Sequence, residues 1–192
     1  MPYIRECIVT TASRSGKVHI APLGIIADKD GWIIAPFRPS TTLDNLAEVP
    51  IAVANYTDDV RIFAGCLTGR KEWPTVGLKS SPVPRLQAAL AHSVLEVVRI
   101  EDDGVRPRHF CRVREGETHA PFTGFNRAKA AVLELAILVS RLGMLPREKI
   151  EAEIAYLTIA IEKTAGEEER EAWGWLMERV TDHFSGAEPR QS

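Results

Sequence analysis

Cysteine is scarce in this sequence, and its spacing matches neither a disulfide framework nor a common metal site. The three residues, Cys7, Cys66 and Cys111, are odd in number and include no Cys-x-x-Cys pair. This argues against a small secreted protein held by disulfides, so we expect a reducing, cytoplasmic location. His109 and Cys111 would share one face of a strand, with His119 nearby, but a zinc site needs further ligands of matching geometry. We therefore expect no bound metal.

Long apolar runs and excess basic charge are missing too. The longest apolar stretch, residues 130–139, contains Glu134 and is too short to span a bilayer, and the N-terminus lacks a secretion-signal layout. Lys and Arg number 24 against 26 Asp and Glu, with no dense basic cluster, so we expect neither a membrane nor a nucleic-acid partner. Hydrolase, NTPase and Rossmann functions have little support, because the sequence contains no Ser-His-Asp constellation, P-loop or Gly-x-Gly-x-x-Gly motif.

The chain up to about residue 123 carries mostly β signals. Apolar and β-branched segments separated by short turns predict antiparallel strands at 7–11, 18–27, 32–37, 51–56, 93–101 and 105–114. Short helices are expected at 42–49 and 58–67, the second capped by Asp58 or Asp59. Residues 68–84 contain three prolines and two glycines and are expected to form an irregular loop. This pattern predicts a barrel or a sandwich.

The C-terminal third has helical periodicity instead. Helices are expected at 126–142, 148–163 and 167–183, separated by Gly143, Pro146 and Gly166. The sequence therefore predicts an α+β, mainly β protein with two domains, a β-barrel at 1–123 and a three-helix unit at 124–192.

The segment 36–46 is the most informative stretch, because it joins a buried strand to a helix start rich in hydroxyl groups. Ser40, Thr41 and Thr42 precede or open the helix, and Arg38 lies just upstream. A helix start offers unpaired N–H groups and a partial positive charge, so these residues suit a phosphate-bearing cofactor. The other interpretation is an ordinary capped helix beside a solvated arginine.

Four segments in order resemble motifs of the FMN-binding split-barrel, flavin-reductase-like proteins: Cys-Ile-Val-Thr-Thr at 7–11, His-Ile-Ala-Pro-Leu-Gly at 19–24, Ser-Thr-Thr-Leu-Asp-Asn-Leu at 40–46 and Val-Ala-Asn-Tyr-Thr-Asp-Asp at 53–59. Asn126-Arg127-Ala128 resembles the helical C-terminal extension of a branch found in archaea and methylotrophic bacteria.

The resemblance implies a six-stranded antiparallel split β-barrel, a homodimer, and FMN as the cofactor. Arg38, Ser40, Thr41 and Thr42 would bind the phosphate, while Asn55 and Thr57 would reach the ring or the ribityl chain. Members of the family often carry asparagine where this chain has His19. The cofactor-binding residues it implies are His19, Ala21, Pro22, Leu23, Gly24, Arg38, Ser40, Thr41, Thr42, Asn45, Asn55, Thr57, Asn126 and Arg127. For Asn126 and Arg127, a helix cap is the open alternative.

The function expected on this basis is that of an FMN-binding flavoprotein, an oxidoreductase of flavin-reductase-like type whose substrate and catalytic residues the sequence does not specify. The alternatives are a split barrel that uses the deazaflavin F420 or haem, and a non-enzymatic flavin-binding or dimerisation module. In the last case the acidic segment 167–171, with Trp173 and Trp175, would dock a partner. The segment 70–84 would be either a lid or a surface excursion.

Overall fold

The computed structural model describes residues 2–29 and 31–186, and the chain folds into two compact units. The first, here called the barrel unit, comprises Met1–Thr57 and Glu72–Phe122. The second, the helical unit, comprises Asp58–Lys71 and Thr123–Ser192. Within the described residues, no helix is both long and apolar enough to cross a membrane.

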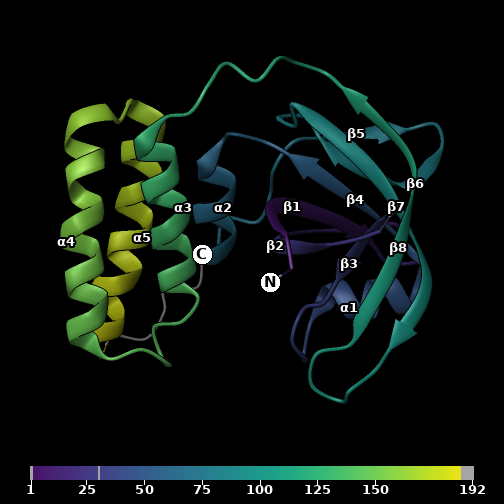
Figure 1. The fold of residues 1–192 in the computed structure, drawn as a ribbon, viewed down its shortest axis with the longest axis horizontal. Coiled ribbons are helices and arrows are strands. Elements are labelled where there is room, and N and C mark those ends of the chain that lie inside the picture. Colours follow the sequence, from purple (N-terminus) through teal and green to yellow (C-terminus); the bar gives the residue numbers. More distant parts are fainter. Residues whose placement is uncertain (1, 30, 187–192) are drawn as a thin grey trace. The chain divides into compact units, whose positions relative to one another are not determined.

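In the described part of the barrel unit, six antiparallel strands close into a barrel, which confirms the predicted fold (Figure 1). The order around the barrel is β1-β2-β3-β8-β7-β4. The strands are β1 (Ile4–Ala12), β2 (Val18–Asp28), β3 (Gly31–Ile34), β4 (Ile51–Tyr56), β7 (Ala91–Glu101) and β8 (Arg108–Thr118).

Alternation along the strands builds the barrel core, because successive side chains point to opposite faces of a strand. Cys7 and Val9 of β1 point inward with Ile25 of β2, where they meet Ala52 and Ala54 of β4. The two alanines leave room for the larger side chains across the barrel. Helix α1 (Thr41–Glu48) adds Leu46 to the same cluster, so this helix is anchored to the barrel by its apolar face.

The segment predicted as an irregular loop instead contains a two-stranded hairpin, β5 (Thr75–Leu78) and β6 (Ser81–Leu86). Prolines are tolerated there because each strand has only one neighbour, so one edge needs no N–H donors. Val83 of β6 packs with Val53 and Val94 on the outer face of the barrel. One strand of the hairpin is therefore anchored to the barrel through Val83, so the segment is a packed hairpin and the predicted irregular loop is wrong.

The helical unit has four helices among its described residues: α2 (Val60–Leu67), α3 (Arg127–Val139), α4 (Arg147–Thr164) and α5 (Glu167–Ser185) (Figure 1). The last three are the predicted C-terminal helices. Their shared core includes the fully buried Leu135, Ile150 and Leu176.

Helix α2 groups with these helices, whereas the predicted domain boundary at residue 123 assigned it to the barrel domain. Its apolar side chains Val60 and Ala64 belong to the core of the helical unit. At the N-terminus, the Asp59 carboxylate accepts the Arg61 N–H at 3.1 Å, as the capping pattern predicted.

A candidate anion site at the start of helix α1

Helix α1 begins without the side-chain cap that its sequence offers. Ser40 is the N-cap residue, and its carbonyl accepts the N–H groups of Leu43 and Asp44 at 3.0 and 3.1 Å, yet its side chain makes no capping hydrogen bond. Serine normally caps through its hydroxyl. The amides of Thr41 and Thr42 lie in the first turn, where a helix supplies no acceptor of its own. This helix start therefore presents N–H donors and a partial positive charge without a side-chain cap.

Arg38 lies two residues before this start and is held by a carboxylate. Its Nη1 and Nη2 donate to the two carboxylate oxygens of Asp102, each at 2.7 Å. Both side chains are about half exposed, and the pair holds the pKa of Asp102 down to about 2, helped by the Gly104 N–H. A guanidinium has five N–H groups, so three remain for a second acceptor while Asp102 fixes the plane of the group.

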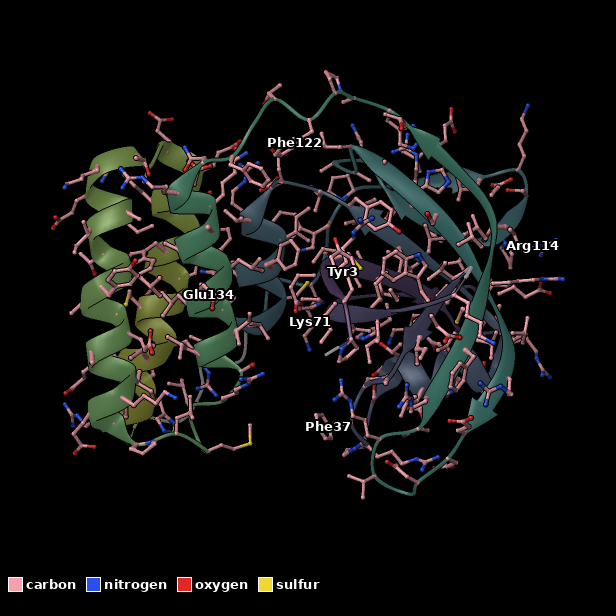
Figure 2. The ribbon with its side chains drawn as sticks, viewed as in Figure 1. Tyr3, Phe37, Lys71, Arg114, Phe122 and Glu134 are labelled. Carbon is pink, nitrogen blue, oxygen red and sulfur yellow. The ribbon has the colours of Figure 1, made fainter. Side chains whose placement is uncertain are left out.

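The turn that carries Asp102 is fastened to the loop between β3 and α1. The Arg38 N–H donates to the Val105 carbonyl at 3.0 Å, and the Arg106 Nε donates to the Ala35 carbonyl at 2.5 Å. The exposed ring of Phe37, labelled in Figure 2, lies 4.8 Å from the Arg106 guanidinium carbon. The loop conformation upstream of α1 is thus set by residues about 65 positions later, which a local sequence pattern does not reveal.

His109 is a buried polar group beside this arrangement. It pairs with Ile34 across β3 and β8, and within the described residues its Nδ1 has no hydrogen-bond partner. Burial lowers its pKa, against the opposite effects of a hydrogen bond to the Pro107 backbone and of the Asp102 charge, and the charge of Arg38 lowers it slightly further. The sequence suggested His109 only as a partly buried strand residue or a weak metal ligand. The structure instead gives this end of the barrel a neutral imidazole with an unused nitrogen.

The inner face of α1 connects the helix start to strands β1 and β2. The Asn45 amide donates to the Thr11 hydroxyl at 3.0 Å, and Thr11 is the strand partner of His19. Thr42 and Asn45 are both buried, whereas Thr41 is exposed. Thr11 therefore links Asn45, to which it is hydrogen-bonded, with His19, its partner on the neighbouring strand. The three hydroxyl residues predicted to bind the phosphate thus differ in exposure: Thr41 is exposed, Ser40 is half-buried and Thr42 is buried.

The predicted ring-contact segment of β2 pairs with β1 along its whole length. Ala21 pairs with Val9, Pro22 with Ile8, and Leu23 with Cys7. Leu23 packs against the barrel core. A Cβ added at Gly24 would lie 2.8 Å from the Glu6 Oε1 and 2.8 Å from the Ile4 Cγ2, so a larger residue there would have to displace these two exposed side chains.

Asn55 lies near the end of β4 and Thr57 directly after the strand, and both make hydrogen bonds within the barrel unit. The Asn55 amide nitrogen donates to the carbonyls of Ile8 and Val53 at 3.0 and 3.1 Å, and to the Thr10 hydroxyl. The Asn55 oxygen accepts the Leu86 N–H at 2.7 Å. The Thr57 hydroxyl donates to the Ala88 carbonyl at 2.9 Å. These bonds tie β6 and the segment after it to the barrel.

Asn126 and Arg127 belong to the helical unit. The Asn126 oxygen caps α3 by accepting the N–H groups of Ala128 and Lys129 at 2.7 and 3.2 Å, and its nitrogen donates to the Thr164 carbonyl. Arg127 is exposed. The capping alternative thus describes what Asn126 does in this structure.

The closed six-stranded antiparallel barrel and the C-terminal helices form the split-barrel architecture that the sequence resemblance predicted. Two sequence profiles of one family match the chain, the N-terminal domain of the "protein of unknown function (DUF447)" at residues 5–120 and its C-terminal part at 126–178. The chain belongs to the DUF447 family. No curated protein sequence matches it significantly.

Solved structures share the fold at low sequence identity. The FMN-bound protein MM1853 from Methanosarcina mazei, of the same family, is 21% identical with a TM-score of 0.79, over 92% of this chain and 94% of its own. Flavoredoxin from Methanosarcina acetivorans is 12% identical with a TM-score of 0.52, over 60% and 69%. The flavin reductase PheA2 is 15% identical with a TM-score of 0.52, over 59% and 78%. The first match covers nearly the whole chain and so includes most of the helical unit, whereas the other two cover about three fifths of the chain.

Proposed function

We propose that this protein binds FMN, with the phosphate at the start of α1, and acts as an oxidoreductase of flavin-reductase-like type. The observation that carries the proposal is the start of α1. The hydroxyl of the N-cap residue Ser40 makes no capping hydrogen bond, and Arg38, which is held in place by Asp102, lies two residues before it. The description of a family member as FMN-bound supports the choice of ligand.

The donors at this start fit a phosphate dianion. They are the first-turn amides of Thr41 and Thr42, the hydroxyls of Ser40 and Thr41, and the three N–H groups of Arg38 that Asp102 does not use. Charge-assisted bonds of this kind are stronger than neutral ones, so the phosphate would supply a large share of the affinity. Asp102 would act as a positioning residue, because it fixes the guanidinium plane before the ligand arrives.

Bound flavin supplies hydride and electron transfer, and the protein's own residues bind and orient it. Arg38 and the α1 amides would hold the phosphate, while β2 between His19 and Gly24 would lie beside the ring. The buried His109 Nδ1, which has no partner within the described residues, would gain one from the ligand or from water it orders. Asn126 and Arg127 stay a weaker proposal, because the Asn126 amide already caps α3.

We also propose a two-fold homodimer, which is the commonest soluble assembly, working in a reducing, cytoplasmic location. The barrel domain would carry the cofactor. The thiols of Cys7 and Cys111 are buried and unpaired, as expected for a protein that needs no disulfide. Sedimentation of the purified protein tests the dimer directly.

The decisive experiment compares FMN with riboflavin, since only FMN carries the phosphate. In the flavin-free protein, Arg38→Ala combined with Thr41→Ala should weaken FMN by about 1.5–3 kcal/mol or more, roughly tenfold to a hundredfold, and leave riboflavin almost unchanged. Flavin fluorescence quenching measures both affinities. Arg114→Ala is the matched control, because Arg114 is another exposed arginine, on β8 (Figure 2).

Equal weakening of the two ligands would place the phosphate elsewhere and refute the site. A purified protein that is colourless and ignores added FMN would refute flavin binding altogether, and a preference for F420 or a haem Soret band would select another cofactor. Bound FMN that neither NADH nor NADPH reduces would favour the non-enzymatic alternative.

A further inference from the structure

His92 and His119 form a hydrogen-bonded pair of imidazoles on the barrel unit, apart from the residues placed at the start of α1. The His92 Nδ1 and the His119 Nε2 lie 2.8 Å apart, and the two rings are within 5° of parallel, with centroids 5.0 Å apart. Only 2% of His92 is exposed, whereas His119 is partly exposed. Glu117 offers a carboxylate to the same place, and one ligand atom from each of the three residues lies within 4.8 Å of the others.

The β7–β8 ribbon brings these three residues together by its register. His92 of β7 is the direct strand partner of Glu117 of β8, so their side chains leave the sheet on the same face. His119 follows Glu117 by two residues, which returns it to that face. Its backbone N–H donates to the Leu90 carbonyl at 2.7 Å, so the backbone after β8 stays fastened beside β7.

We propose that His92, Glu117 and His119 form a binding site for a divalent transition metal, with Zn²⁺ as the best-suited ion. Two imidazoles and one carboxylate are a common donor set for zinc, and three protein ligands leave a fourth position for water or a small ligand. Carboxylate-rich sites suit Mg²⁺ and Ca²⁺, whereas imidazoles select ions of the zinc type.

The distances require only a side-chain adjustment. Zn–N bonds of about 2.0–2.1 Å at tetrahedral angles put two ligand nitrogens roughly 3.3 Å apart. The imidazole nitrogens at 2.8 Å, now joined by a hydrogen bond, are thus about half an ångström too close for two zinc ligands. Rotation of the partly exposed His119 ring opens this gap, while the buried His92 keeps its place. The proton between the two rings moves to the far nitrogen of the ring that carries it, so that both facing nitrogens offer a lone pair to the metal.

The protonation state of His92 favours metal binding. Burial lowers its pKa, and the charges of His119 and Arg85 lower it further, against the opposite effects of Glu117 and Glu115. The imidazole is therefore neutral at pH 7, which is the form that binds a metal. Its Nε2 is buried without a hydrogen-bond partner in the described part of the chain, so Nδ1, the nitrogen that faces His119, is the one available to a metal.

Calorimetric titration of the tag-free, chelator-treated full chain with Zn²⁺ tests the site. We expect one ion per chain, and at least about a hundredfold weaker binding in His119→Ala, because even outer-shell partners of a metal contribute tenfold to a hundredfold. His119 is the first choice for substitution because it is less buried than His92. Glu117→Gln should weaken binding about tenfold or more on the same reasoning. His183→Ala, on the last turn of α5, is the matched control and should change nothing.

Co²⁺ added to the flavin-free protein gives a second measurement. Intense visible bands of a four-coordinate cobalt ion are expected with the unchanged chain and should be absent in His119→Ala. No binding of either ion, or binding that survives His119→Ala undiminished, would overturn the proposal. Binding lost equally in His183→Ala would also overturn it, and unchanged binding in Glu117→Gln would remove the carboxylate from the site.

Discussion

Replacing Asn55 with alanine separates its two possible roles, as part of the barrel and as a cofactor ligand. The side chain is fully buried, and its amide links β4 to β1 through Ile8 and to β6 through Leu86. Removing the amide leaves the buried Leu86 N–H without its acceptor. We therefore expect a loss of barrel stability whether or not flavin is present.

The size of the loss follows from these bonds. An unsatisfied buried donor costs about 1–3 kcal/mol, and the lost bonds from the amide nitrogen add roughly 1 kcal/mol net. Asn55→Ala should therefore destabilise the barrel unit by about 2–4 kcal/mol. Asn55→Asp is the sharper variant, because it keeps an oxygen for Leu86 but directs a carboxylate at the Ile8 and Val53 carbonyls.

That carboxylate has a pH signature. Burial beside carbonyl oxygens raises the pKa of the introduced acid above its value in the unfolded chain, so the folded state binds the extra proton. The stability of Asn55→Asp must then be greatest at low pH and fall as the pH rises through the raised pKa. The unchanged protein has no such dependence at this position.

Urea unfolding and amide hydrogen exchange measure these effects. The Leu86 amide reports directly, because its N–H loses its acceptor in Asn55→Ala and should exchange faster than in the unchanged protein. Unchanged stability and unchanged Leu86 protection, together with a selective loss of flavin affinity, would refute the structural role and return Asn55 to the ligand list.

Three further predictions concern other parts of the chain. Asn126→Ala removes the α3 cap and should lower the stability of the helical unit by about 0.5–2 kcal/mol in thermal unfolding, without the selective loss of FMN over riboflavin expected for a phosphate ligand. The Asp102 carboxyl, followed by carbon NMR, should titrate near pH 2. Its stabilising pairing with Arg38 is complete above about pH 4 and lost as the pH falls towards 2, and Arg38→Ala should return the midpoint towards the ordinary value. The Cys7 and Cys111 thiols, whose pKa burial raises to about 12, should stay unmodified by a thiol reagent at pH 8 until the protein unfolds, and rapid modification of either would contradict their burial.

Elements with strong periodicity were predictable from the sequence. The strand at 51–56 and the C-terminal helices match the structure within a few residues, because each is a long or uniformly apolar pattern. The hairpin β5–β6 was missed, because prolines at 82 and 84 suggest a loop unless the strand is known to lie at an edge. The partner of α2 was not predictable either, since an apolar helix face does not specify what covers it.

Some features of the candidate site were likewise predictable from the sequence, and others were not. The start of α1 was predictable, because proline, hydroxyl residues and a following apolar face mark a helix start locally. The pairing of Arg38 with Asp102 was not, because it joins residues 64 positions apart that only the folded loop brings together. The pair of His92 and His119 was missed because β8 was predicted to end at residue 114, whereas it continues to Thr118. A register that includes 117 and 119 would have placed both opposite the start of β7.

Helix α2 makes the division of this chain into two units discontinuous. The backbone leaves the barrel unit after Thr57, returns at Glu72 and leaves again after Phe122, so three covalent links join the units. Ending the protein at residue 122 would therefore not give an isolated barrel. Helix α2 would remain without the helices that cover Val60 and Ala64, and its exposed apolar face would favour aggregation. A clean excision must also exchange 58–71 for a short polar bridge. Because the two units are covalently linked, the effective concentration of each unit for binding to the other is high.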